Sequence, residues 1–142
     1  MNIGKSVGGQ GFELLTPLMD VPSTLKRLGN DVDLFNQIIQ IYLEDSPDLF
    51  ASARQAISEN DAPSLRRAAH SLKGLTATMS ASRAVSAAFH LEQLGAGSDL
   101  DEAPAALEQL NQRLAELNAA LEAYRRQVDA QSQQDHAIHS QA

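Results

Sequence analysis

The sequence predicts an all-α protein: an antiparallel, up-and-down four-helix bundle preceded by a short extra helix. Helix-forming Ala, Leu, Gln and Glu are abundant, whereas aromatic residues, which favour strands, make up only 4% of the chain. Apolar residues recur at alternating spacings of three and four in several segments. The connections between these segments are short, which makes successive helices antiparallel neighbours.

Composition excludes several classes of function. The chain of 142 residues suits one domain with loose ends, and its lack of Cys excludes disulfides, thiol nucleophiles and Cys-based zinc sites. A net charge of −7 argues against nucleic acid as a partner. No apolar run is long enough to span a bilayer, and Met1–Gly11 lacks the apolar centre of a signal peptide. We therefore expect a cytoplasmic monomer without membrane insertion.

The N-terminal part contains little that predicts regular structure. Four glycines before residue 12 lead us to expect a flexible leader over residues 1–19. A short helix is expected from Pro22 to Leu28, stopped by Gly29 and Asn30.

Asp31 is the expected N-cap of the second helix. Its main core face is predicted by helical spacing to comprise Leu34, Ile38, Ile41 and Tyr42. Pro47 is expected to end or kink this helix at Ser46, with the apolar rhythm resuming afterwards.

Asp61 should cap a third helix that runs to about Met79. A fourth helix should be capped by Ser80 or Ser82 and end at Gly95 and Gly97.

The last helix should start at residues 99–101. Its stripe comprises Leu107, Leu110, Leu114, Leu117, Leu121, Tyr124 and Val128. The bundle then covers residues 20–128, and residues 129–142 are expected to form a disordered polar tail, since they offer almost nothing to bury.

His70 stands out on the third helix. It lies about 160° from the centre of the apolar arc at 100° per residue, so it should face solvent. Gly74, one turn later, costs about 1 kcal/mol relative to Ala in a helix, a cost that close approach of another protein to His70 would explain. Ala77 keeps the next turn low, and Lys73 can screen charge placed on the imidazole.

Charge is distributed unevenly along the chain. Residues 62–91 contain no Asp or Glu but include Arg66, Arg67 and Lys73 on the His70 side. We expect this basic face to attract an acidic site on a partner. His90 has no Lys or Gly at matching spacing and is interpreted as a structural or surface residue.

The run Ala69-His70-Ser71-Leu72-Lys73-Gly74 resembles the His-x-Leu-Lys-Gly signature of histidine phosphotransfer (HPt) domains. Similarity to the family also includes residues 25–31, residues 35–47 and the Leu91-Glu92 pair before Gly95, so it covers roughly residues 21–128. One departure is Met79-Ser80-Ala81, where the family usually has a glycine just after the phosphosite helix.

The resemblance implies a phosphorelay intermediate of a two-component system, without kinase activity of its own. His70 would be the phosphoacceptor, with Lys73 as electrostatic helper and Gly74 as clearance. The partners would be receiver domains of a hybrid sensor kinase, a response regulator or both. The chain would need no cofactor, because Mg²⁺ is expected on the receiver only.

Docking of a receiver should use polar and apolar contacts. The candidate partner-binding residues are Arg66, Arg67, Ala77, Phe35 and Ile39, although the last two can equally belong to the core of a wide helix face.

Three alternative functions would each require different sequence features. A non-phosphorylated helical adaptor would need neither Gly74 nor an acid-free span. The dimerisation bundle of a kinase would need an ATP-binding domain downstream. A di-metal bundle enzyme would need inward-facing Glu-x-x-His pairs, which the sequence lacks.

Overall fold

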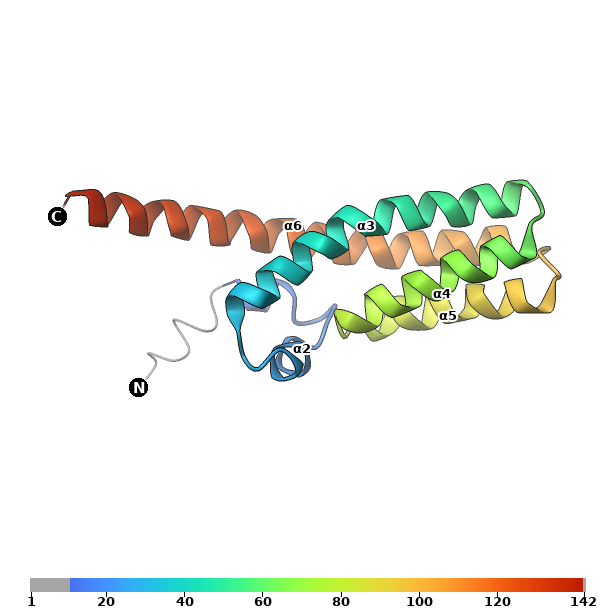
Figure 1. Cartoon of the computed structure of the whole chain (residues 1–142), viewed down its shortest axis with the longest axis horizontal. Coiled ribbons are helices and arrows are strands. Elements are labelled where there is room, and N and C mark those ends of the chain that lie inside the picture. Colours follow the sequence, from blue (N-terminus) through green and yellow to red (C-terminus); the bar gives the residue numbers. More distant parts are fainter. Residues whose placement is uncertain (1–10, 142) are drawn as a thin grey trace.

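The computed structural model describes the backbone of residues 11–141 and the side chains of residues 11–134. This part of the chain is helical and contains no strand, so the all-α prediction is confirmed. Its elements are η1 (Phe12–Leu14), α2 (Val21–Arg27), α3 (Val32–Ser58), α4 (Ala62–Thr78), α5 (Ser82–Gly97) and α6 (Ala103–Gln141). Figure 1 shows α3 to α6 lying along one long axis, with the chain reversing direction from each helix to the next.

Two helices begin at their predicted caps. The Asp31 carboxylate accepts a hydrogen bond from the backbone N–H of Leu34 at 3.0 Å, and Asp61 accepts one from Ser64 at 3.1 Å. The predicted cap of α5 is wrong, because its N-cap is Ala81, which makes no side-chain capping bond.

Ser80 has a different role in the turn between α4 and α5. It adopts a left-handed conformation with φ 52°, the kind of backbone for which glycine is best suited. Its hydroxyl accepts hydrogen bonds from Thr24 Oγ1 at 2.9 Å and from Arg27 Nη2 at 3.0 Å. Serine is thus compatible with this turn. Its hydroxyl is hydrogen-bonded to residues of α2 and does not cap α5.

The core face of α3 differs from the predicted one. Phe35 and Ile39 are fully buried, whereas Ile41 is 49% exposed. Phe35 packs edge-on against Phe12 and Tyr124, with ring centroids 5.7 and 5.8 Å apart. The prediction that Phe35 and Ile39 bind a partner is therefore wrong, because the N-terminal segment and α6 cover this side of α3.

Pro47 does not end α3, which is continuous from Val32 to Ser58. Figure 1 shows its ribbon changing direction along its length. Proline removes one helical hydrogen bond and crowds the carbonyl four residues earlier. Where the helix is packed both before and after the proline, it bends at this point instead of ending.

Both predicted termini need correction. The leader was expected over residues 1–19; residues 1–10 lie outside the described residues, but Leu15 and Met19 are buried in the core and Phe12 stacks on Tyr124. At the other end α6 continues to Gln141, past the predicted end at Val128 (Figure 1). Residues 129–141 contain no Gly or Pro to stop a helix that packing has already started.

Candidate functional site

α4 presents His70 to solvent, as its spacing predicts. The side chain of His70 is 66% exposed. Leu65, Ala69 and Leu72, on the opposite face, are fully buried. The helix is thus held by its apolar side while the imidazole remains accessible.

Gly95 brings α5 close to α4. It lies inside α5 rather than at its end, and Ser98 takes the left-handed C-cap with φ 62° instead. A Cβ added at Gly95 would lie 2.8 Å from the backbone nitrogen of Arg66. The helix does end at Gly97, as predicted. Gly95 serves a different purpose from the predicted stop, because it lets the two backbones approach each other.

This close approach places Glu92 of α5 beside His70. The imidazole Nδ1 lies 2.7 Å from Glu92 Oε2, and the carboxylate is largely buried, with 14% of its side chain exposed. A carboxylate oxygen can only accept, so in the neutral imidazole Nδ1 carries the proton and Nε2 keeps a free lone pair. Glu92 therefore orients the ring with its Nε2 available.

Glu92 also binds Lys73, whose Nζ lies 2.7 Å from Oε1. The nearby Lys73 ammonium, aided by the hydrogen bond from His70, lowers the pKa of Glu92 despite its desolvation. The Lys73 ammonium lies 5.0 Å from the centre of the Phe89 ring. Lys73 is thus held across the α4–α5 interface by a carboxylate and an aromatic ring.

Sequence reasoning did not include Glu92 or Phe89 in the site. The available signal was that Glu92 is the first acidic residue after the acid-free span of residues 62–91. Phe89 is 45% exposed, one helical turn before Glu92. It provides, beside Lys73, an exposed apolar side chain that the buried Phe35 and Ile39 cannot provide.

The two turns of α4 that follow His70 carry small residues on its side of the helix. A Cβ added at Gly74 would meet no atom within 4 Å, and Ala77 is exposed on the next turn. No packing within the described part of the chain requires a glycine at position 74. This leaves the approach to His70 open.

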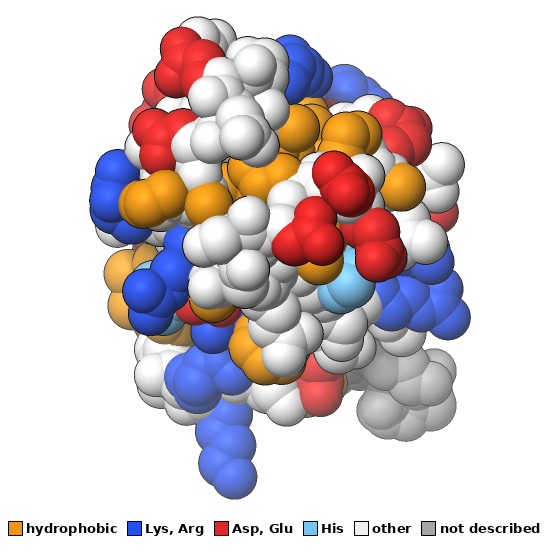
Figure 2. Space-filling view, turned by 90° about the vertical axis from the view of Figure 1, so that its right-hand side faces the viewer, with side chains coloured by type: hydrophobic (Ala, Val, Ile, Leu, Met, Phe, Trp, Pro, Cys, Tyr) orange, Lys and Arg blue, Asp and Glu red, His pale blue; other side chains and the backbone are white. Residues whose placement is uncertain are grey.

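A surface hollow lies on the other side of His70, which we call the His70 hollow. Its lining residues are Pro63, Arg66, Arg67, His70, Ser71 and Glu92. Arg66 and Arg67 are exposed, and Arg67 Nη2 donates a hydrogen bond to Ser64 Oγ at 2.9 Å. In Figure 2, which views one end of the molecule, Lys and Arg side chains follow one another down the left side, while a group of Asp and Glu lies to the right.

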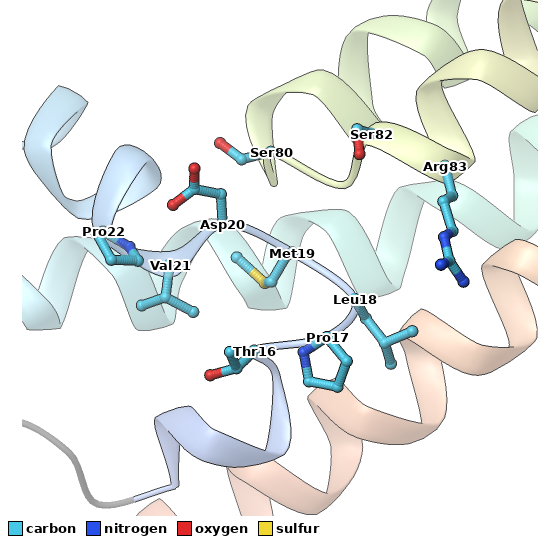
Figure 3. Close-up of a pocket in the computed structure, with 10 residues that line it drawn as sticks. All are labelled: Thr16, Pro17, Leu18, Met19, Asp20, Val21, Pro22, Ser80, Ser82 and Arg83. Atoms are coloured by element: carbon cyan, nitrogen blue, oxygen red, sulfur yellow. The ribbon is translucent and has the colours of Figure 1, made fainter.

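A second hollow lies where residues 16–20, which join η1 to α2, and the start of α2 face the α4–α5 turn and the start of α5 (Figure 3). Its one carboxylate, Asp20, caps α2 by accepting hydrogen bonds from Ser23, and these bonds lower its pKa. Figure 3 shows Arg83 pointing away from Asp20. The hollow therefore lacks a nucleophile paired with an acid or base.

Residues 11–134 include no group of three or more His, Asp or Glu side chains placed to bind a metal ion. None of the helices in the described residues is both long and apolar enough to cross a bilayer. His90 is exposed on α5.

The chain is similar to a known family and to a solved structure. A family model described as Hpt domain matches residues 37–137. The crystal structure of histidine-containing phosphotransfer protein B (HptB) from Pseudomonas aeruginosa PAO1 is similar, with a TM-score of 0.72 and 25% sequence identity. The match covers 78% of this chain and 96% of that one. No curated protein matches the chain.

Proposed function

Since the chain belongs to the Hpt domain family, we propose that it relays a phosphoryl group between aspartates of receiver domains through His70. The observation that carries the proposal is the exposed imidazole whose Nδ1 is bound to Glu92, which leaves Nε2 free to attack. In this proposal α3 to α6 act as an antiparallel up-and-down bundle that presents the ring on a rigid helix.

The chemistry needs positioning and charge neutralisation more than covalent help. The Nε2 lone pair of His70 forms the N–P bond while the P–O bond of the receiver's phospho-aspartate breaks and its electron pair returns to the carboxylate. The ring keeps its Nδ1 proton and gains one positive charge. Glu92, 2.7 Å away, offsets that charge, and the reverse step would deliver the phosphoryl group to the next receiver.

Other residues of the site have supporting roles in this proposal. Lys73 holds Glu92 in place and adds positive charge to the face that meets the receiver. Gly74 and Ala77 leave room for the receiver, and Phe89 offers it an apolar contact.

The partner supplies what this chain is proposed not to need. Mg²⁺ and the acidic phosphorylation pocket would belong to the receiver, and the chain would act in the cytoplasm as a monomer, as a carrier without kinase activity of its own.

Transfer from isolated receivers tests the proposal. The full chain is incubated with phosphorylated candidate receivers, and acid-labile label on the chain is followed over time. We expect the wild type and His90→Gln to take up label and His70→Gln to take up none, although all three should be folded, since both histidines are exposed. Label retained by His70→Gln, or lost in His90→Gln, would refute the assignment.

A further inference from the structure

We propose that the phosphoryl group carried on Nε2 of His70 sits in the His70 hollow, with Arg66 as its principal counter-ion. This inference rests on the proposed function and goes beyond it by naming the cation that the phosphorylated state uses.

The direction of the side chain places the ring over this hollow. Side chains on an α-helix lean toward its N-terminus, so a residue covers the turn before its own Cα. For His70 that turn contains Arg66 and Arg67, which line the hollow together with the imidazole. Lys73 lies one turn C-terminal to His70, and its side chain leans back toward the ring. It is bound to Glu92, however, and is not among the lining residues.

The three cations near His70 differ in their existing partners. Lys73 is bound to Glu92 at 2.7 Å and lies over the Phe89 ring. Arg67 donates to Ser64. Hydrogen bonds from Ser64, together with the positive charge of Arg67, lower the pKa of the Asp61 cap.

Arg66 is the third cation near His70, and it differs from Lys73 and Arg67 in its partners. Among the residues whose side chains the structure describes, none makes a hydrogen bond or ion pair with Arg66. Its backbone is held against Gly95, while its side chain is exposed at the edge of the hollow. A guanidinium offers paired N–H donors that match phosphoryl oxygens. Arg66 can therefore bind the phosphoryl group without breaking a contact, which Lys73 and Arg67 cannot do.

The experiment loads the full chain without a partner. Phosphoramidate is the donor: Nε2 of His70 forms a bond to phosphorus while the bond to ammonia breaks and ammonia leaves. The ³¹P NMR signal of phospho-His70, identified by its loss in His70→Gln, is then titrated with pH. The wild type is compared with Arg66→Gln, Lys73→Gln and Arg83→Gln; Arg83 is an exposed arginine at the start of α5, away from the hollow.

A nearby cation favours the dianionic phosphoryl group and lowers its pKa. We expect Arg66→Gln to raise the titration midpoint by about half a pH unit, the effect of one charge about 5 Å away in a water-like medium. Lys73→Gln should raise it less and Arg83→Gln should leave it unchanged. Glu92, Arg67 and the ring Nδ1 also face the group, but they are common to every sample, so the difference isolates the substituted residue.

A midpoint that is unchanged in Arg66→Gln, or raised more in Lys73→Gln, overturns the inference. A cooperative melting transition confirms that each variant is folded. Arg66→Gln and Arg83→Gln should melt as the wild type does, because both side chains are exposed, whereas Lys73→Gln loses its ion pair with Glu92 and should melt at a lower temperature. The receiver assay tests the proposed function separately. If receivers phosphorylate the chain but Arg66→Gln leaves the titration midpoint unchanged, only this inference is refuted. If Arg66→Gln raises the midpoint but no receiver phosphorylates the chain, only the relay is refuted.

Discussion

Gly74 and Gly95 both lie within helices, where glycine is unfavourable. The structure nevertheless predicts opposite changes in stability when each is replaced. We compare Gly74→Gln on α4 with Gly95→Ala on α5. The first side chain would enter open solvent beside His70, and the second would enter the contact between two helices.

The magnitudes follow from the space at each position. An added Cβ at Gly74 meets nothing within 4 Å, so Gln should stabilise the helix by about 0.5–1 kcal/mol through its better helix propensity. At Gly95 the added Cβ would lie 2.8 Å from the backbone nitrogen and 3.0 Å from the Cα of Arg66. Backbone cannot move aside as a flexible side chain does, and such overpacking costs about 1–3 kcal/mol. Gly95→Ala should therefore be destabilising despite the gain in helix propensity.

The rate of phosphoryl transfer should respond the other way, with the larger direct loss in Gly74→Gln. Gln at position 74 stands one turn from His70, where a receiver must approach. A steric cost of about 1.4 kcal/mol in the complex would slow transfer about tenfold. Gly95→Ala should affect transfer only through the fraction of folded protein and through displacement of Glu92.

Urea unfolding and the initial rate of transfer from a phospho-receiver measure both effects. A Gly74→Gln variant that is less stable than wild type, with a transfer defect that merely follows unfolding, would show that Gly74 serves packing and would refute the clearance argument. A stable Gly95→Ala variant would refute the account of the α4–α5 contact.

Three further predictions concern other parts of the molecule. Leu15 is 0% exposed, so Leu15→Ala should lower the free energy of unfolding by about 2–5 kcal/mol; a change within error would show that this segment does not dock in solution. The pKa of Glu92 is lowered in the folded chain from a usual 4.5, so its contribution to stability is complete at pH values above 4.5 and is lost as pH falls below it; the melting temperatures of wild type and Glu92→Gln should differ at pH 7, the difference should shrink as pH falls below 4.5, and a constant difference would count against the ion pair. With ATP and Mg²⁺ alone the purified chain should not label itself, since its sequence contains no recognisable nucleotide-binding motif, and label on His70 would contradict this.

Local physics explains which predictions from the sequence succeeded. Helix propensity and spacing are properties of neighbouring residues, and they predicted an all-helical chain with His70 on the exposed face of α4. The caps at Asp31 and Asp61 depend on an oxygen and an N–H three residues apart. Each of these features is determined within about one or two helical turns, so the sequence alone could predict it.

The wrong predictions involve contacts between distant segments. Phe35 and Ile39 are apolar residues on a wide helix face, and only the packing of η1 and α6 decides that they are buried. The N-terminal segment is too short for its apolar residues to show a period, yet Leu15 is buried in the core.

The sequence by itself determined the helices, the acid-free span around His70 and the exposure of that ring, because these depend on local spacing. Tertiary structure alone decided which side chains join His70 there. Glu92 is 22 residues away along the chain and reaches Nδ1 only because Gly95 lets α5 pack closely on α4. The partners of Lys73 likewise come from α5. A contact between two helices depends on their relative rotation and separation, which follow from packing of the whole core and not from the residues of either helix.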